Sequence, residues 1–217
     1  MQHTPLPTDR TTITRLAKRG AYDTATIYAI LDEALVCHVS YVLNGQPFVI
    51  PTGYCRIDNK LYLHGSVGSH FFRELAKGTD VCICVTLLDG LVLARSAFHH
   101  SVNYRSVVVF GKTQLIEDEQ EKWLSLARFT EHMIPGRWAE VRQPDASEMK
   151  KTMVIAIPLD EASAKIRTGG VGDDPEDMDI PVWAGVLPLK LIPEAPVPDT
   201  QLKPDIALPD YVSGYTR

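Results

Sequence analysis

A loop of small polar residues, GSVGS at 65–69, leads directly into the helix-like segment HFFREL. Such a loop at a helix start offers unpaired backbone N–H groups, hydroxyl donors and the positive end of the helix dipole to an anion. His70 and Arg73 lie in the first turn, where a cation opposes the dipole unless an anion is bound nearby. Ser66, Ser69, His70 and Arg73 are therefore candidate phosphate ligands, although Ser69 can also be a simple N-cap.

Other polar side chains interrupt apolar sequence. Arg105 stands in the strand-like run YRSVVVFG, and because burying an unpaired guanidinium is costly, it should face an anion or a carboxylate. His64, in LYLHG, is either a structural histidine or a hydrogen-bonding group near neutral pH. The adjacent His99 and His100 are either solvated or ligands of a metal or haem. No catalytic triad or carboxylate pair with a recognised spacing is present, and we expect no bound metal ion.

The segments that position these residues read as strands joined by tight turns. Residues 35–43 alternate apolar and polar, and Asn44-Gly45 predicts a hairpin into the strand that starts at Gln46. The strand from Gln46 is also expected to form a hairpin with the strand after residue 60, and Phe48, Ile50, Leu61 and Leu63 predict that this hairpin is buried. A second turn is expected at residues 57–60, and Asp89-Gly90 predicts a third hairpin, between strands 80–87 and 91–98.

Helices are expected at residues 25–34, 71–77, 118–132 and 146–151, the first and third capped by Asp23 and Asp118. Strands following strands at short spacing predict a mostly β, α+β fold built as an antiparallel barrel. The predicted organisation is an extended N-terminal arm (residues 1–21), one barrel domain (22–190) and a proline-rich C-terminal tail (191–217).

Composition narrows the functional class. The chain has 217 residues and a net charge of −5, without a Lys/Arg-rich stripe, so we expect no nucleic-acid partner. It contains neither an apolar run of about 20 residues nor an apolar signal-peptide core, so we expect no membrane association and a cytoplasmic location. The four cysteines fall in apparent strands and are expected to be reduced core residues.

A family resemblance rests on four segments in the same order, QPFVIPTGY, LYLHGSVGSHFF, ARSAFHHSVNYRSVVVFG and PVWAGVLPL. Through them the sequence resembles the FMN-binding split barrels related to pyridoxamine-phosphate oxidase. Within these barrels it is most similar to the branch of flavin-nucleotide-binding and nitroimidazole-resistance proteins. The resemblance covers about residues 22–189. It implies an antiparallel six-stranded-type split β-barrel with a few flanking helices. It also implies a homodimer with FMN in clefts at the subunit interface.

The resemblance assigns roles residue by residue. The strand beside the flavin would be Val49, Ile50, Pro51, Thr52, Gly53 and Tyr54. The residues near the flavin and its phosphate would be His64, Gly65, Ser66, Ser69, His70 and Arg73, with His64 as a tentative catalytic group. The residues that close the site would be Arg105, Ser106 and Trp183. The Arg-Lys phosphate pair of the oxidases reads His70-Phe71 here, so Arg73 or another residue must supply the permanent positive charge.

The oxidases' C-terminal Arg-x-His substrate motif has no counterpart after Trp183, so vitamin B6 oxidation is not expected. The resemblance instead implies an FMN-dependent oxidoreductase that passes electrons from a reduced donor to a small acceptor, such as a nitro-aromatic compound. Three alternatives stay open. They are a flavin-nucleotide carrier, store or sensor without turnover, a protein that binds a deazaflavin in place of FMN, and a haem-binding barrel that uses His99 or His100.

Overall fold

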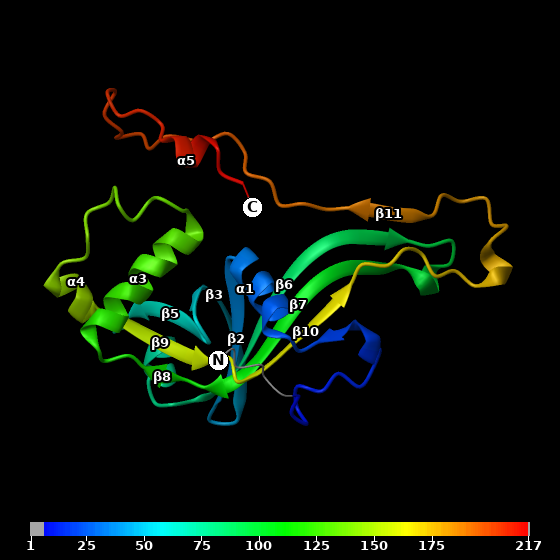
Figure 1. The fold of residues 1–217 in the computed structure, drawn as a ribbon, viewed down its shortest axis with the longest axis horizontal. Coiled ribbons are helices and arrows are strands. Elements are labelled where there is room, and N and C mark those ends of the chain that lie inside the picture. The colour runs from blue at the N-terminus through cyan, green and yellow to red at the C-terminus, as the bar shows by residue number, and fades with distance from the viewer. Residues whose placement is uncertain (1–6, 217) are drawn as a thin grey trace.

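The computed structural model describes residues 7–216, which form two antiparallel sheets (Figure 1). The larger sheet runs, in spatial order, β1 (Gly20–Ala21), β10 (Glu161–Arg167), β7 (Ser101–Lys112), β6 (Asp80–Leu93), β2 (Val36–Leu43) and β3 (Gln46–Gly53), with β11 (Gly185–Pro188) paired to β6. The smaller sheet runs β4 (Cys55–Ile57), β5 (Lys60–Ser66), β9 (Thr152–Pro158) and β8 (Gln114–Leu115). This is the mostly β split barrel with flanking helices that the sequence predicts.

The main core lies between the two sheets, because alternate residues of each strand point inward. On β2 the buried positions are Cys37, Val39 and Tyr41. The same core receives side chains from the other strands, namely Val81, Ile83 and Val85 of β6, Val107 and Val109 of β7, Leu61 and Leu63 of β5, and Ile155 and Ile157 of β9. Burial of this apolar surface is the main favourable term in folding.

Two helices close this core. Helix α1 (Thr24–Glu33) starts where the Asp23 side chain accepts a hydrogen bond from the Thr26 N–H, as predicted, and it buries Ile27, Ile30 and Leu31. Helix α2 (His70–Leu75) starts where the Ser69 side chain accepts from the Phe72 N–H. It buries Phe72 and Leu75, so the loop at 65–69 is anchored to the core on both sides.

A second, smaller core lies on the outer face of the smaller sheet. It is covered by α3 (Glu119–Met133), which Asp118 caps as predicted, and by the nearby α4 (Ala146–Lys151). Its buried members are Cys55, Tyr62, Ile116, Leu126, Val154 and Ala156. Strand β5 is therefore buried on both faces, and α3 lies over the strand that carries His64 (Figure 1).

The local turn signals have mixed outcomes. Asn44 and Gly45 have positive φ (51° and 77°) and join β2 to β3, and Asp58 (φ 49°) joins β4 to β5, as predicted. The hairpin predicted at Asp89-Gly90 is wrong. Strand β6 continues through this dipeptide with a β-bulge, because Asp89 receives hydrogen bonds from Arg105 and Gly90 lies against the backbone of β11.

The predicted burial of the hairpin at residues 46–66 is confirmed for Leu61 and Leu63 and is wrong for most of its first strand. Strand β3 is at the edge of the larger sheet, and Phe48 and Val49 are 37% and 60% exposed. Ile50 packs against the main core, and Phe48 stacks on the buried core residue Tyr41, with ring centroids 5.3 Å apart. On the neighbouring strand, Val36 and Val42 are exposed as well. Together β2 and β3 present an apolar outer face that the barrel does not use.

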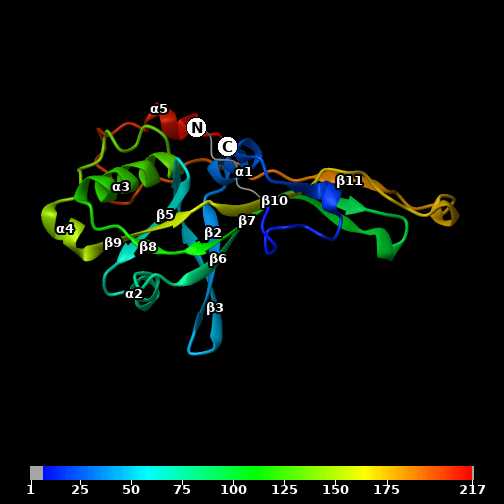
Figure 2. The same ribbon diagram turned by 60° about the horizontal axis from the view of Figure 1, so that its bottom comes forward.

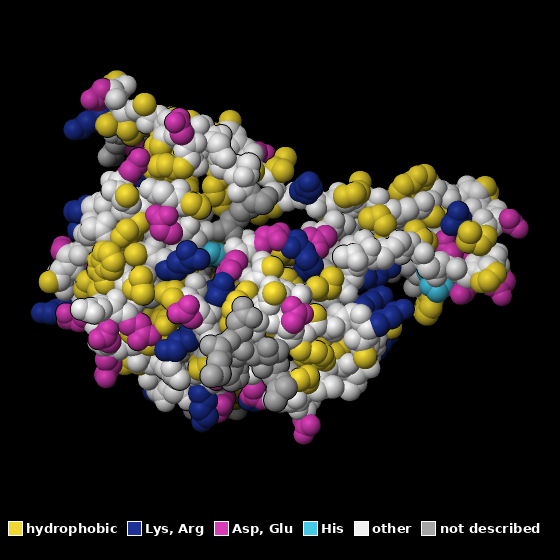
Figure 3. Space-filling model, viewed as in Figure 1, with side chains coloured by type: hydrophobic (Ala, Val, Ile, Leu, Met, Phe, Trp, Pro, Cys, Tyr) yellow, Lys and Arg dark blue, Asp and Glu magenta, His cyan; other side chains and the backbone are white. Residues whose placement is uncertain are grey.

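Beyond the barrel, β6 and β7 continue as a projecting ribbon, and β11 runs beside them (Figures 1 and 2). We call residues 88–104 together with β11 the hairpin arm. A 3-10 turn (Ala97–His99) lies at its tip, next to a second 3-10 turn (Pro175–Asp177) in the acidic segment that leads to β11. Figure 3 shows apolar side chains spread over the surface of this arm.

Both ends of the described chain pack back onto the domain. A 3-10 turn (Ala17–Arg19) precedes β1, which pairs with β10, so the predicted arm joins the sheet at residues 20–21, and its residues 1–6 lie outside the described part. The tail returns along the molecule and ends in α5 (Asp210–Ser213), where Tyr211 contacts Arg137 and Glu140. No described helix has the length and hydrophobicity needed to cross a membrane.

All four cysteines are free and lie in strands, as predicted, but they differ in burial. Cys37 and Cys55 are buried, and burial raises the pKa of each thiol to about 12. Cys82 and Cys84 are on the other face of β6 and are partly exposed. The expectation that all four are core residues is therefore wrong for these two.

Candidate functional site

The loop at 65–69 is a tightly bonded turn at the end of β5. The Ser66 hydroxyl accepts a hydrogen bond from the Gly68 N–H (3.1 Å), and the Ser69 N–H donates to the Ser66 carbonyl (2.9 Å). Gly65 lies directly under the Phe72 ring, where a Cβ would be 2.2 Å from a ring carbon. The Ser69 hydroxyl caps α2, so capping explains that residue without a ligand, and a helix of six residues adds only a weak dipole.

The cations of this loop are available to a ligand. The His70 side chain is 63% exposed, and its Nε2 is 3.8 Å from Glu74 Oε1. Arg73 is exposed, and among residues 7–216 no hydrogen bond or ion pair uses its guanidinium. Ser66 and Gly68 are also exposed. The predicted phosphate ligands thus form one accessible cluster.

His64, two residues before Ser66, lies at a different kind of place. It pairs with Val154 in the sheet and points into a pocket of about 340 Å³ beneath α3. Burial lowers the pKa of the imidazole, because the charged form loses hydration. Phe129 packs edge-on against the ring, with centroids 4.3 Å apart. We call this cavity the His64 pocket.

Sequence analysis missed most of the His64 pocket. Its other walls are Leu126, Phe129, Thr130, Trp138, Arg142, Pro144, Glu148 and Thr152. Arg142 is held by Glu148, with Nη2 to Oε1 at 2.6 Å. The available signal was the loop at 134–145, which is long for a helix connection and carries a Trp and two Arg residues.

Strand 49–54 divides into exposed and buried parts. Val49 and Pro51 are exposed at the edge of the larger sheet, and Gly53 lies under the ring of Phe129. Tyr54 is fully buried and donates a hydrogen bond from its hydroxyl to the Leu31 carbonyl (2.6 Å). Its side chain therefore serves the core and is not offered to a ligand in this chain.

Arg105 faces carboxylates, one of the two outcomes that the sequence predicts. Its guanidinium donates to Asp89 (Nε to Oδ2, 3.0 Å) and forms a two-point pair with Glu33. These hydrogen bonds, first those to Glu33 and then those to Asp89, raise the pKa of Arg105. Ser106 donates to the Lys165 carbonyl (3.2 Å). Arg105 is therefore engaged by α1 and β6, and Ser106 is engaged within the larger sheet.

Trp183 is 68% exposed and leans over Gly185 at the start of β11. Strand β11 and helix α2 lie at opposite ends of the molecule (Figure 2). The sequence-predicted residues therefore gather in separate places on one chain, which are the loop before α2, the edge strand β3, the Glu33–Asp89 side of β7 and the hairpin arm. Their convergence on one cofactor stays a prediction that needs a second subunit.

At the tip of the hairpin arm, His99 and His100 have different surroundings. His99 Nε2 is 3.0 Å from Asp174 Oδ2. The imidazole of His100 is held on its Nδ1 side, 3.0 Å from the Ser96 carbonyl, and the residue is exposed. In a neutral imidazole whose Nδ1–H donates to a carbonyl, Nε2 carries the lone pair, which is the usual arrangement of a metal-ligating histidine.

Comparison with known proteins identifies the family. Residues 23–166 match the family model described as pyridoxamine 5'-phosphate oxidase. The chain belongs to this family. Among solved structures it is similar to the flavocytochrome Anf3 from Azotobacter vinelandii, with 40% identity, a TM-score of 0.90, and coverage of 97% of this chain and 98% of that one. No curated protein matches the chain.

Two further solved structures extend the comparison. The FAD and haem binding protein from Mycobacterium smegmatis is 34% identical, with a TM-score of 0.87 and coverage of 91% of this chain and 97% of that one. A protein from Bacteroides thetaiotaomicron described as a 5-nitroimidazole antibiotic resistance protein is 25% identical, with a TM-score of 0.58 and coverage of 68% and 86%. The pyridoxamine 5'-phosphate oxidase model ends at residue 166, so the acidic segment, β11 and the tail lie beyond the part common to the family.

Proposed function

We propose that this chain binds both a flavin nucleotide and haem and acts in electron transfer. The observation that carries the proposal is its likeness, over 97% and 91% of its length, to two proteins whose names state a flavocytochrome and an FAD and haem binding protein. These matches extend well beyond the residues that the family model covers. A bound flavin would supply hydride and electron chemistry, and haem would supply one-electron chemistry.

The structure offers a fitting place for the nucleotide phosphate. Ser66, His70 and Arg73 are exposed together at the loop before α2, and Arg73 is free to pair with an anion. His64 lies on β5, two residues before Ser66, and lines the His64 pocket of about 340 Å³. An imidazole kept neutral by burial can hydrogen-bond a ligand there without adding charge.

FMN is the nucleotide that the sequence favours, and FAD is the competing one because the protein from Mycobacterium smegmatis is named for it. We further propose a homodimer with the cofactor site at the subunit interface. It is supported by the exposed apolar face of β2 and β3, where Val42 and Val49 are 62% and 60% exposed, and by the separation of the predicted site residues on one chain.

For haem, the exposed residue with the geometry of an iron ligand on the hairpin arm is His100. Phe98 (88% exposed) on this arm and Trp183 (68% exposed), just before β11, could cover an apolar macrocycle. His99 is less suited, because its Nε2 already faces Asp174. The role proposed for His100 is to hold the iron through Nε2.

The first experiment is an absorption spectrum of the untagged protein, with mass determination of the released small molecules. We expect flavin bands together with a Soret band. In His100→Ala the Soret band should be lost while the flavin stays, and His99→Ala is the matched control that should keep both. A protein that binds neither cofactor after reconstitution would contradict the proposal.

A second experiment separates an oxidoreductase from a flavin carrier. The oxidoreductase should accelerate electron transfer from a reduced nicotinamide or another donor to a small acceptor, nitro-aromatic compounds included. Tight flavin retention without any acceleration would favour the carrier, store or sensor. Arg73→Ala should weaken flavin binding by roughly 1.5–3 kcal/mol for each charged hydrogen bond lost, and unchanged affinity would place the phosphate elsewhere.

A further inference from the structure

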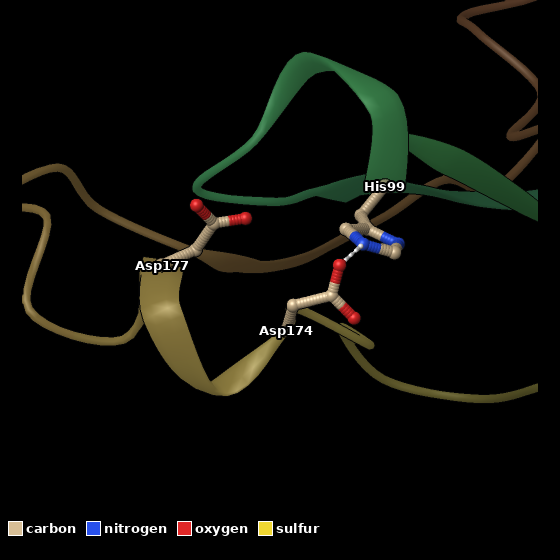
Figure 4. Close-up of side chains that lie close together, drawn as sticks. All are labelled: His99, Asp174 and Asp177. Carbon is tan, nitrogen blue, oxygen red and sulfur yellow. Dashed lines mark hydrogen bonds and ion pairs between the residues drawn. The ribbon is translucent and has the colours of Figure 1, made fainter.

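At the tip of the hairpin arm, one imidazole and two carboxylates face one another from two separate segments (Figure 4). His99 ends the 3-10 turn of the hairpin, while Asp174 and Asp177 come from the acidic segment before β11. One ligand atom from each of the three residues lies within 4.8 Å of the others. None of these residues has a role in the flavin site described above.

Backbone geometry explains why the two carboxylates lie on the same side. The Asp177 N–H donates to the Asp174 carbonyl (3.0 Å), which closes one 3-10 turn. Side chains three residues apart on such a turn eclipse one another. Asp174 and Asp177 therefore project toward the same space, and His99 enters that space from the other segment (Figure 4).

The neighbouring residue Asp173 fixes the acidic segment to the hairpin. Its side chain is 1% exposed and accepts hydrogen bonds from the backbone N–H of Arg95 (3.0 and 3.1 Å) and from its guanidinium (2.9 Å). The guanidinium of Arg95 is therefore paired with Asp173. Across residues 7–216, no Lys or Arg forms an ion pair with Asp174 or Asp177. Within that described part of the chain, the ion-pair partner of Asp174 is the imidazole of His99.

The spacing suits a metal ion. Ligand atoms at about 2.0–2.2 Å from a metal ion are about 3.0 Å apart in octahedral geometry and about 3.4 Å apart in tetrahedral geometry. His99 Nε2 lies 3.0 Å from Asp174 Oδ2, with which it now shares a hydrogen bond. A carboxylate oxygen of Asp177 lies within 4.8 Å of a ligand atom of each of these two residues and would complete the set. One imidazole with two carboxylates suits Zn²⁺ or Mn²⁺ better than Mg²⁺ or Ca²⁺, which prefer oxygen ligands alone.

We propose that His99, Asp174 and Asp177 bind a divalent transition-metal ion that clips the acidic segment to the tip of the hairpin arm. The site holds three protein ligands and leaves further coordination positions for water. Metal binding replaces the direct contact between His99 and Asp174, and it requires the neutral imidazole, so affinity falls as the pH is lowered. The proposal differs from the expectation from the sequence, which names no metal ligand.

The test titrates the untagged, chelator-treated protein with Mn²⁺ and follows the free ion by electron paramagnetic resonance. This readout of the free ion works in the presence of flavin and haem. Zn²⁺ is measured in parallel by calorimetry, and Mg²⁺ serves as the comparison ion. We expect one saturable site for Mn²⁺ and Zn²⁺ per chain, with Zn²⁺ bound more tightly.

Matched variants decide the location. His99→Ala and Asp177→Asn should each weaken Mn²⁺ binding by about tenfold or more, while the neighbouring Glu176→Gln should stay close to wild type. Hydrogen exchange of residues 171–178 should slow on Zn²⁺ addition in wild type and not in Asp177→Asn. Circular dichroism checks that each variant is folded, and Asp174→Asn replaces any variant that is not.

Either of two results would overturn the proposal, namely no saturable binding of Mn²⁺ and Zn²⁺ or equal binding by all variants. The proposal does not rest on the flavin or the haem. The Soret band reports on His100 and Mn²⁺ binding on His99, so the two proposals fail separately.

Discussion

Phe129 lies edge-on against His64, with ring centroids 4.3 Å apart and planes at 82°. The same phenyl ring covers Gly53, where a Cβ would be 2.9 Å from a ring carbon. One residue of α3 therefore contacts both β3 and β5, the two strands that the sequence assigns to the flavin. It also shields the imidazole from water, which agrees with the lowered pKa of His64.

The first prediction concerns this shielding. In Phe129→Ala, water reaches the imidazole, so the pKa of His64 should rise toward its ordinary value, as measured by NMR titration of the ring resonances. The free energy of unfolding should fall by about 1–3 kcal/mol, since the ring is only partly buried. Phe98→Ala removes an 88% exposed ring and should change neither quantity. An unchanged His64 pKa in Phe129→Ala would refute the shielding by Phe129.

The second prediction is a pH dependence of stability. Because burial lowers the pKa of His64 in the folded state, the unfolded chain binds the proton more readily. The contribution of His64 is therefore fully present above its unfolded pKa, about 6.5, and is lost as the pH falls from there toward the folded pKa. Urea unfolding between pH 5 and 8 measures the free energy of unfolding of wild type and of His64→Gln. As the pH is lowered, this free energy should fall less steeply in the variant than in wild type. Parallel curves would show that His64 is not a source of the dependence.

The third prediction uses two glycines of one loop. In Gly65→Ala the new methyl group would overlap the buried ring of Phe72, so we expect a loss of about 1–3 kcal/mol in the free energy of unfolding. In Gly68→Ala the nearest atom is the Ser66 hydroxyl at 3.5 Å, and stability should change by less than about 0.5 kcal/mol. Chemical denaturation compares the two. Equal losses in the two variants would mean that the Phe72 contact does not decide the cost of the added methyl group.

Turns and helix caps, which depend on neighbouring residues, could be predicted from the sequence. Strand pairing between distant segments could not. The turn at Asn44-Gly45 and the caps at Asp23 and Asp118 depend on a few neighbouring residues, and the structure confirms them. Asp89-Gly90 has the same turn chemistry, yet β6 runs through it, because β7 and β11 pair with the strand on both sides. That pairing is a property of the whole sheet.

The candidate site shows the same division. The loop at 65–69 and its exposed cations could be read from adjacent residues. The other walls of the His64 pocket come from α3, the loop at 134–145, α4 and the first residue of β9, about 60 to 90 residues later in the chain. Periodicity alone does not say which strand a helix covers. The cluster of His99 with Asp174 likewise spans 75 residues. It exists because the acidic segment folds back along the hairpin arm.

The last prediction separates the two roles open to Ser69. Its hydroxyl caps α2 by accepting from the Phe72 N–H, so Ser69→Ala should cost about 1 kcal/mol in stability. Ser69→Asp keeps a good capping residue but places a negative charge beside His70 and Arg73. Flavin binding, followed by fluorescence quenching of added FMN and FAD, should therefore weaken in Ser69→Asp although the fold keeps its stability. Ser69→Asn, a neutral cap, is the control and should bind like wild type. If Ser69→Asp also binds like wild type, the phosphate does not lie at this loop, and Ser69 is a helix cap and nothing more.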